Sequence, residues 1–365
     1  MTKKVLLAMS GGIDSSVSAM LLKESKYFIE GITFRSYDSI SKACMEKETG
    51  CCSINSIFEA KHLAETLGFE HSIIDTRTIF HETIIKDFIE QYLRGNTPNP
   101  CVLCNKIIKW GELFNVLNEK GFDYLATGHY ARIGEENGRF FLRRGVDLQK
   151  DQSYFMWRLS QDNLKKTIFP LGDLTKQEAR EIARAHKFEK IAAKRESQEI
   201  CFIENDDYRS FLREMVPDID EKIGEGNFIN KEGKILGKHK GYPFYTIGQR
   251  KGLIIALGKP AYVTDINADT NTITLGDRED LMQCELWIDD INLMKYENLF
   301  NPIKAMCKIR YNSPGEMATI QQFDNKIKIT FDTPTFAITP GQSAVIYEND
   351  DVVGGGIIIS EEVNK

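Results

Sequence analysis

The first 130 or so residues alternate short apolar runs with amphipathic stretches. A short apolar run between polar residues predicts a buried strand, whereas apolar residues three or four positions apart predict one face of a helix. The predicted strands cover residues 5–9, 28–34, 70–75 and 124–127, and the predicted helices cover 14–25, 54–67, 79–93 and 105–118. Strands and helices in this order are typical of βαβ units, so the pattern predicts an α/β fold with a parallel sheet.

The pattern changes after about residue 205. A helix at 176–186, opened by a capping box of Thr175 and Glu178, precedes the change, and a helix at 208–215 follows it. Beyond it lie short apolar stretches separated by glycines, at 261–265, 272–275, 303–311, 326–331, 344–347 and 352–359. Regularly spaced short strands predict a barrel or a sandwich. We expect three domains, at residues 1–205, 206–280 and 281–365.

The composition is that of an ordinary globular protein, because 42 % of the 365 residues are hydrophobic and 27 % are charged. These values exclude long disorder, collagen-like repeats and a small disulfide-stapled fold. No apolar run approaches the ~20 residues that cross a bilayer. The first residues show neither a cleavable signal pattern nor an Arg-rich transit pattern, so we expect a cytoplasmic protein with no membrane partner. In that reducing compartment the eight cysteines should be thiols, and clustered ones point to catalysis or metal binding.

The net charge of −6 gives no general attraction to nucleic acid, but the charge is unevenly distributed. Residues 231–259 contain seven Lys or Arg and one Glu, a net +6, whereas residues 265–300 carry a net −7. The basic residues are Lys231, Lys234, Lys238, Lys240, Arg250, Lys251 and Lys259. A solvated surface seldom separates the two signs in this way, so the basic stretch predicts a local anion-binding surface.

The first motif that carries chemistry is Ser10-Gly11-Gly12-Ile13-Asp14-Ser15-Ser16, between a predicted strand and a predicted helix. Its glycines allow the backbone to approach a ligand, and amide groups at the start of a helix bind anions. The motif lacks the lysine of a GxxxxGK[ST] phosphate loop, and it is not GxGxxG. It resembles the pyrophosphate loop of the N-type ATP pyrophosphatases, which cleave ATP to AMP and pyrophosphate. A serine-rich turn without function is the alternative.

Two further motifs contain cysteines. In Asn99-Pro100-Cys101-Val102-Leu103-Cys104-Asn105-Lys106 the cysteines lie at the start of a predicted helix, where the helix end, Lys106 and Lys109 favour thiolates. A structural zinc site would need a second pair of Cys or His, and no second CxxC or HxxxH occurs. Cys201, between Ile200 and Phe202, would by itself suggest a buried small hydrophobic residue. Two thiols and an ATP loop together indicate sulfur transfer, in which one thiol carries a persulfide and the other resolves it.

With these motifs in place, the chain resembles the bacterial tRNA-uridine 2-sulfurtransferases, which make 2-thiouridine at the wobble position of tRNA. The loop at 10–15 alone would identify only the superfamily, whereas the joint set of motifs is specific. The further matching segments are TPNPxxxCNxxIK at 97–109, ATGHY at 126–130, KDQSYF at 150–155, ICFI at 200–203, TIGQRKG at 246–252, Arg310-Tyr311 and TPGQSAV at 339–345.

The resemblance implies a parallel-sheet ATP-pyrophosphatase domain, a small central tRNA-binding domain and a C-terminal β-barrel. It implies that Cys104 is the catalytic nucleophile and that Cys201 carries the persulfide. The ATP-binding positions that it implies are Ala8, Met9, Ser10, Gly11, Gly12, Ile13, Asp14, Ser15, Phe34 and Gly128. Asn99, Pro100 and Cys101 would contact the flipped target base, and the implied tRNA contacts are His129, Lys150, Asp151, Gln152, Arg310, Tyr311 and Gln342.

One position departs from part of the family. Cys101 stands where some members have an acid that serves as general base, and a thiol with a reference pKa of ~8.5 is a poorer proton acceptor at neutral pH. Cys101, Cys104 and Cys201 could instead be three ligands of an iron–sulfur cluster, a form proposed in related thiolases, although we favour free thiols with a persulfide. Cys44, Cys51 and Cys52 follow the second predicted strand, where a structural or accessory role is favoured over a second metal or redox site.

The implied reaction has two steps. ATP, with Mg²⁺, first adenylates O2 of wobble uridine 34, and persulfide sulfur then replaces the adenylated oxygen, giving 2-thiouridine, AMP and pyrophosphate. The partners would be tRNA and a persulfide donor protein or cysteine desulfurase. The alternatives are another tRNA-modifying ATP pyrophosphatase, as in lysidine or 4-thiouridine synthesis, and a non-catalytic RNA-binding protein that keeps a nucleotide fold.

Overall fold

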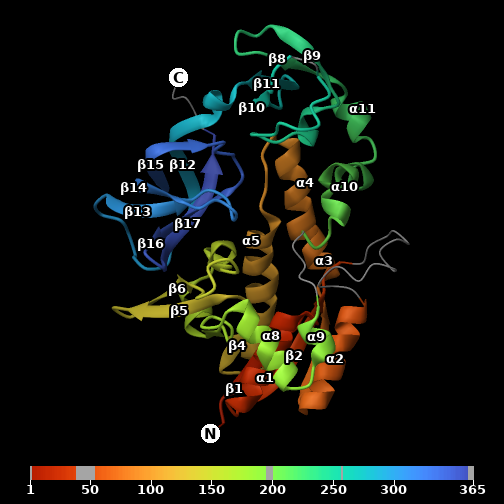
Figure 1. Ribbon diagram of the computed structural model, residues 1–365, viewed down its shortest axis with the longest axis vertical. Coiled ribbons are helices and arrows are strands. Elements are labelled where there is room, and N and C mark those ends of the chain that lie inside the picture. The colour runs from red at the N-terminus through yellow and green to blue at the C-terminus, as the bar shows by residue number, and fades with distance from the viewer. Residues whose placement is uncertain (1, 38–53, 195–199, 256–257, 361–365) are drawn as a thin grey trace.

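The computed structural model describes residues 2–37, 54–194, 200–255 and 258–360. Figure 1 shows a parallel sheet with its helices at one end of the molecule, a small sheet at the other end and a β-barrel to one side. Cys44, Cys51 and Cys52 lie outside the described residues, so the expectation stated for them stays open. The predicted α/β domain, middle domain and β-barrel are confirmed.

The N-terminal sheet has five parallel strands in the order β3-β2-β1-β4-β7. These strands are β1 (Lys4–Ala8), β2 (Phe28–Arg35), β3 (Glu70–Asp75), β4 (Tyr124–Ala126) and β7 (Thr167–Ile168). The helices nearby are α1 (Ile13–Glu24), α2 (Ile54–Leu67), α7 (Gln161–Lys165), α8 (Lys176–Ala185) and α9 (Glu189–Ala192). Val5, Leu6 and Leu7 of β1 are fully buried, as expected for a central strand covered on both faces. The capping box of Thr175 and Glu178 is present, as predicted.

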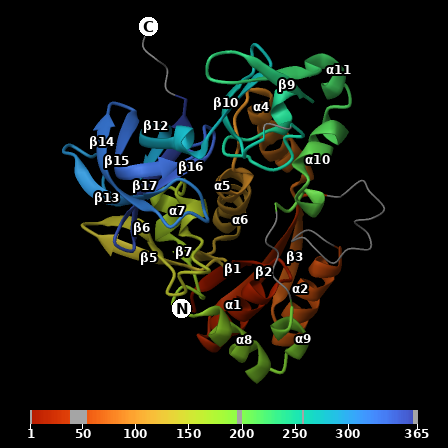
Figure 2. The ribbon, with the colours of Figure 1, turned by 45° about the horizontal axis from the view of Figure 1, so that its top comes forward.

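Two long helical runs lie between β3 and β4, and both contain a π-helical stretch. The first is α3 (Arg77–Phe80), η2 (His81–Ile85) and α4 (Lys86–Leu93), and the second is α5 (Pro100–Cys104), η3 (Asn105–Glu112) and α6 (Leu113–Lys120). The second run begins five residues before the predicted start, because Pro100 occupies the first helical turn, where a missing N–H is tolerated. Figure 2 shows α4 reaching the middle domain, and the Tyr242 hydroxyl donates to the Leu93 carbonyl at 2.6 Å.

The middle domain has a four-stranded sheet in the order β10-β11-β8-β9. Its elements are η5 (Glu204–Asp206), α10 (Tyr208–Met215), α11 (Ile219–Ile223), β8 (Gly226–Ile229), β9 (Ile235–His239), η6 (Tyr242–Phe244), β10 (Tyr262–Asn267), β11 (Thr272–Gly276) and η7 (Arg278–Leu281). The helix at 208–215 and the strands near 261–265 and 272–275 are confirmed, whereas β8 and β9 were missed. Phe228, Val263 and Ile273 are fully buried and form the centre of this domain.

The C-terminal sheet closes into a six-stranded antiparallel barrel, because β12 pairs with β17 as well as with β15. The strands are β12 (Met282–Leu293), β13 (Ile303–Lys308), β14 (Glu316–Phe323), β15 (Lys326–Phe336), β16 (Ser343–Glu348) and β17 (Asp351–Ile359). Ile288, Ile320 and Ile346 are fully buried in its interior. Of these strands, β12 and β14 had not been predicted.

A hairpin from the N-terminal part of the chain extends the barrel sheet. It consists of β5 (Ala131–Glu136) and β6 (Arg139–Arg144), and η4 (Ser153–Met156) follows it. Arg143 of β6 pairs with Asp351 of β17 through the backbone register and through a 2.7 Å ion pair. No strand had been predicted here, although Asn137-Gly138, both at positive φ, is a preferred two-residue hairpin turn.

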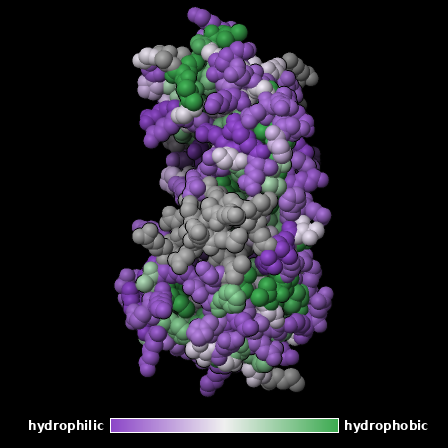
Figure 3. All heavy atoms as spheres, turned by 90° about the vertical axis from the view of Figure 1, so that its right-hand side faces the viewer, coloured by the Kyte–Doolittle hydropathy of each residue, from purple (hydrophilic) through white to green (hydrophobic). Residues whose placement is uncertain are grey.

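The surface is mainly hydrophilic on the face in Figure 3, with small hydrophobic patches toward both ends of the molecule. In the middle domain, Ile254 is 85 % exposed and Ile235 is 61 % exposed. Among the described helices, none is long and apolar enough to span a membrane.

Candidate active site

The loop between β1 and α1 is shaped to hold an anion. Gly11 has φ +69°, and a Cβ on it would lie 2.2 Å from the Ser56 carbonyl oxygen, so only glycine fits. Gly12 is the N-cap of α1, and the Ser15 and Ser16 hydroxyls donate to its carbonyl at 3.2 and 2.8 Å. These bonds fix a turn whose backbone amide groups begin a helix, the arrangement that binds phosphate in many nucleotide sites.

A second loop, residues 126–130, packs against the first. A Cβ on Gly128 would lie 2.8 Å from the Asp14 carbonyl carbon and the Ser15 nitrogen, so glycine permits the close approach of the two loops. The Tyr130 hydroxyl donates to Asp14 Oδ1 at 3.0 Å. The structure therefore brings together the predicted nucleotide residues from two segments, and half-buried Phe34 lies at the end of neighbouring β2.

Two lysines that the sequence analysis missed hold this loop. The Lys176 ammonium lies 2.7 Å from Asp14 Oδ1, and the Lys176 side chain is only 10 % exposed. The Lys194 ammonium donates to the Gly11 carbonyl at 3.0 Å and pairs with Glu59. Both lysines lie more than 160 residues from the loop in sequence, and no local pattern marks them.

The predicted thiol segment begins on helix α5. Asn99 is its N-cap, Pro100 opens its first turn, and Cys101 and Cys104 are half-buried. Both thiols are thus within the first five residues of the helical run. The Asn105 amide, buried behind them, donates to the Phe155 carbonyl at 2.9 Å.

Cys201 is exposed, and its neighbours anchor it to the same region. Phe202 is buried among the rings of Phe80, Phe88 and Phe211, with centroid distances of 5.1 to 5.7 Å. Cys104 packs against the hydrophobic cluster that contains Phe202. The fold thus brings two motifs that are 97 residues apart in sequence into one cluster.

Within the described parts of the chain, no three or more His, Cys, Asp or Glu side chains lie close enough to hold a metal ion. Cys101, Cys104 and Cys201 all belong to these parts, so the structure does not gather them as ligands of an iron–sulfur cluster. We therefore derive no step through a cluster.

Asp151 was expected to contact tRNA, but its side chain is buried. Its oxygens accept from the Gly145 and Ser153 backbone amides at 3.2 and 3.1 Å, from the Ser153 hydroxyl at 3.0 Å and from Arg144 at 3.3 Å. Its carboxylate thus stabilises its own loop. Gln152 is partly exposed and accepts from the Tyr130 amide at 3.0 Å, and Lys150 is partly exposed beside them.

His129, another expected tRNA contact, is also buried. Burial, and secondarily the charge of Lys109, hold the pKa of His129 well below its ordinary value, so the imidazole is neutral. Its Nδ1 lies 2.8 Å from Thr127 Oγ1 and its Nε2 lies 3.2 Å from the Lys109 ammonium. The side chain is therefore fixed beneath the surface.

The barrel holds the segment that precedes the cysteines. The Gln342 amide donates to the Thr97 and Pro98 carbonyls at 2.9 and 3.2 Å, and the Thr97 amide donates to the Pro340 carbonyl at 2.9 Å. Gly341, at φ +88°, faces the Thr97 carbonyl so closely that a Cβ would lie 2.9 Å from it. We call this contact between residues 97–98 and 340–342 the barrel clamp.

Arg310 and Tyr311 support the same side of the barrel. The Arg310 guanidinium donates to the carbonyls of Phe336 and Ala337, which precede the clamp. The Tyr311 ring lies 4.5 Å from the Phe155 ring. The structure thus brings most of the expected tRNA-contact positions to the border between the α/β domain and the barrel.

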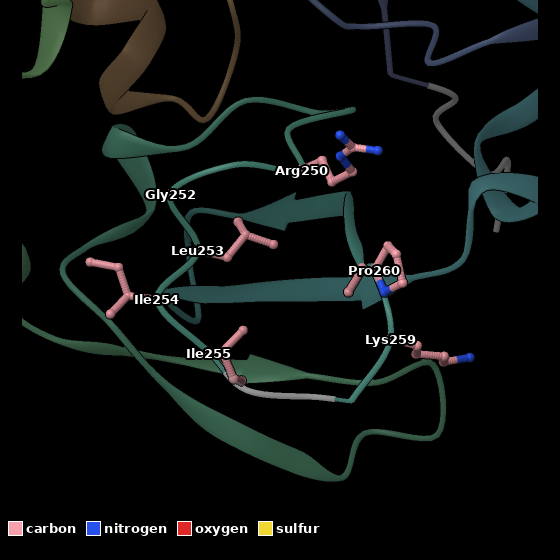
Figure 4. Close-up of a pocket in the computed structure, with 8 residues that line it drawn as sticks. Arg250, Gly252, Leu253, Ile254, Ile255, Lys259 and Pro260 are labelled. Atoms are coloured by element: carbon pink, nitrogen blue, oxygen red, sulfur yellow. The ribbon is translucent and has the colours of Figure 1, made fainter.

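The basic stretch of the middle domain is only partly available to a ligand. Lys231 pairs with Asp280, and Lys259 pairs with Asp277 at 2.8 Å, so two of the seven basic residues are neutralised by the acidic stretch. Four further basic residues are exposed: Lys234, Lys238, Lys240 and Lys251. Arg250 is exposed at the edge of an open hollow of about 370 Å³ that Leu253, Ile255 and Pro260 also line (Figure 4).

Comparison with known proteins agrees with this arrangement. Residues 3–205 match the tRNA methyl transferase HUP domain, 209–277 the tRNA methyl transferase PRC-barrel domain, and 283–358 the aminomethyltransferase beta-barrel domain. The chain is 48 % identical over 356 residues to the tRNA-specific 2-thiouridylase MnmA of Amoebophilus asiaticus, with 97 % of this chain and 95 % of that protein covered. It is 47 % identical over 363 residues to the protein of the same name from Cytophaga hutchinsonii, with 99 % of both covered.

Proposed function

Because the chain belongs to the tRNA-specific 2-thiouridylase family, we propose that it converts wobble uridine 34 of tRNA to 2-thiouridine at the expense of ATP. The observation that carries the proposal is that the chain combines an anion-binding loop with two thiol motifs, one at a helix start and one exposed, which the fold brings to one hydrophobic cluster. Domain boundaries near residues 205 and 280 are part of the proposal, and the extents of the three family matches support them.

The first step is adenylation. Uridine O2 attacks the α-phosphorus of ATP, the bond to the pyrophosphate group breaks, and the uridine N3 proton is released to solvent. The close packing of Gly11 against Ser56 and of Gly128 against Asp14 supports a nucleotide cradle here. Its amide groups stabilise the charge that develops on the pyrophosphate. Mg²⁺ bound to the phosphates, with Asp14 nearby, would supply further charge neutralisation.

The second step is sulfur transfer. The terminal sulfur of a Cys201 persulfide attacks C2 of the uridine, and the C2–O bond breaks so that AMP leaves. The Cys104 thiolate then attacks Cys201 Sγ, which breaks the S–S bond, frees 2-thiouridine and leaves a Cys104–Cys201 disulfide. Alternatively, Cys104 attacks first and frees sulfide, which then attacks C2. Both routes end in a disulfide, so each turnover needs a dithiol reductant.

The exposure of Cys201 supports a role as the thiol that meets the sulfur donor, which we propose is a persulfide-bearing protein such as a cysteine desulfurase. Asn99, Pro100 and Cys101 are proposed to meet the extruded base, since a base must leave the stack before its C2 can be attacked. Lys150, Gln152 and Tyr311, which are partly exposed, are the proposed tRNA contacts near the site.

The test combines two measurements on purified protein. With ATP, tRNA and labelled pyrophosphate, we expect ATP–pyrophosphate exchange that depends on tRNA. With a cysteine desulfurase and cysteine added, mass spectrometry of the tRNA nucleosides should detect 2-thiouridine. A transcript with cytidine at position 34 is the control and should give neither signal. Exchange with a different modified nucleoside would favour another ATP pyrophosphatase, and tRNA binding without exchange would favour a non-catalytic protein.

A further inference from the structure

Lys109 links the helical run that carries Cys104 to the loop at 126–130, a contact that its place in the sequence does not reveal. It lies five residues after Cys104, in the π-helical stretch η3 that continues helix α5. At ~1.5 Å per residue, the two residues are separated by about 7.5 Å or less along the helix axis. π-Helical stretches are rare and are frequent at functional sites. Half-buried Lys109 extends to His129, and its ammonium lies 3.2 Å from His129 Nε2.

His129 is a fixed hydrogen-bond acceptor for this lysine. Because the imidazole is neutral and Nε2 accepts from the ammonium, Nδ1 carries the proton and donates to Thr127 Oγ1 at 2.8 Å. The ring packs against Trp110 at a centroid distance of 5.6 Å, and the Trp110 indole is itself bonded to Thr167 at 2.9 Å. The imidazole therefore orients the ammonium but does not cancel its charge.

The charge of Lys109 remains available for an anion. Lysines with restricted exposure are usually paired with a carboxylate. Within the described residues, Lys109 forms no ion pair, and its ammonium donates to the neutral His129. In contrast, Lys176 in the same site is paired with Asp14. A half-buried ammonium held by a neutral partner is suited to bind a negatively charged ligand.

The neighbours of His129 show where such a ligand would lie. Gly128 packs on the backbone of Asp14 and Ser15, and Tyr130 donates to the Asp14 carboxylate. His129 lies between these two residues in sequence, so the loop that holds Lys109 is also the loop that closes on the phosphate turn. On its other side, Lys109 belongs to the helix of Cys104. The lysine thus connects the two halves of the proposed reaction.

We propose that Lys109 is a catalytic residue that stabilises the charge developing on the α-phosphate during adenylation and on the departing AMP, with His129 as its positioning residue. The inference rests on the proposed function. As O2 attacks the α-phosphorus, charge grows on the oxygens of that phosphate, and the ammonium stabilises it. When sulfur attacks C2 and the C2–O bond breaks, the same ammonium stabilises the departing AMP. Lys109 transfers no proton in either step. Its contribution is electrostatic.

The test uses Lys109→Met, which keeps the aliphatic stem and removes the charge. Removal of one stabilising charge or donor typically lowers a rate ~10²- to 10³-fold, and we expect that loss in tRNA-dependent AMP formation. Affinity for ATP should change by less than about threefold, because the turn at 10–16 still holds the terminal phosphates. Lys165→Met, an exposed lysine on α7, is the matched control and should retain the wild-type rate.

Two further measurements separate this role from others. The rate of Cys104 alkylation by iodoacetamide should be similar in wild type and Lys109→Met. Slower alkylation with unchanged AMP formation would mean that the lysine serves the thiol, and this would overturn the proposal. If ATP affinity and the rate of AMP formation fell by the same factor, the proposal would also be overturned. That result would mean that Lys109 stabilises the ground state as much as the transition state, or that the fold is damaged. If wild-type protein itself forms no AMP with tRNA, the proposed function fails before Lys109 is tested.

Discussion

The barrel clamp predicts that Gln342 acts on catalysis without binding tRNA. In Gln342→Glu, the two N–H groups that reach the Thr97 and Pro98 carbonyls are replaced by a carboxylate oxygen that repels them. Leaving carbonyl groups without donors costs ~1–3 kcal/mol. This corresponds to about a 5- to 150-fold shift of the equilibrium from clamped to displaced residues 97–98. Since Asn99 and Pro100 follow directly, the displaced loop misaligns the helix start that carries the thiols.

The assay compares turnover with tRNA affinity. We expect 2-thiouridine formation at saturating tRNA to fall by about 5- to 150-fold in Gln342→Glu, while the tRNA Kd changes by less than about threefold. Gly341→Ala tests the same clamp by a different route, because its Cβ would press on the Thr97 carbonyl. Gln321→Glu makes the same charge change on an exposed position of β14 and should leave both quantities unchanged. A weaker tRNA Kd with normal saturated turnover would refute the reasoning and identify Gln342 as a tRNA contact.

Three further outcomes are expected. Asp14→Ala should abolish AMP formation and lower the free energy of unfolding by ~1–3 kcal/mol, because the nearly buried Lys176 loses its carboxylate; AMP formation at the wild-type rate in folded protein would contradict the assignment. Cys201→Ser should not acquire transferable ³⁵S from a desulfurase, whereas Cys104→Ser should acquire it on Cys201 without passing it to tRNA, and label on Cys104 would reverse the roles. Removing four exposed charges should reduce the slope of the log of the tRNA binding constant against the log of the salt concentration by up to ~0.7–0.9 per lost phosphate contact. An unchanged slope would mean that these residues are ordinary solvated surface. The four are Lys238, Lys240, Arg250 and Lys251.

A last prediction concerns acid stability. Burial between Phe228 and Tyr245 lowers the pKa of His239 to about 4, and its Nδ1 accepts from the Gly241 amide at 3.1 Å. The unfolded chain takes up this proton near pH 6.5, whereas the folded chain does so only near pH 4, so stability falls as the pH is lowered between these values. We expect the thermal midpoint of the middle domain to fall less steeply over this range in His239→Gln, and an identical slope would contradict this.

The sequence predicted the local parts of this molecule better than its long-range contacts. Val5–Leu7 gives a clear buried-strand signal, and the turn at 10–16 is recognisable from glycine and serine spacing alone. The resemblance implied a barrel, but the pairing of β12 with β17 that closes it was not predictable from the residue pattern. It joins segments about 60–70 residues apart that carry no mutual signal. A sandwich and a barrel share the same alternation of strands and turns.

In the candidate site, residue types were recognisable but burial was not. Cys104 and Cys201 were identified by chemistry, yet only the fold places their motifs at one cluster. The resemblance implied that His129 and Asp151 contact tRNA, whereas internal partners hold both side chains beneath the surface. The Gln342–Thr97 contact joins positions 245 residues apart and has no local signature.

The hairpin β5–β6 is synthesised long before β17, the barrel strand with which it pairs. Arg143 leaves the ribosome 208 residues before its partner Asp351. At ~5–20 residues per second, the hairpin waits about 10–40 s with an unpaired strand edge. Such an edge can pair with another chain, and the partly exposed Arg139, Arg143 and Arg144 of β6 are charges of the kind that discourage this. A nascent or truncated chain that ends before β17 therefore keeps this edge of β6 open to other chains.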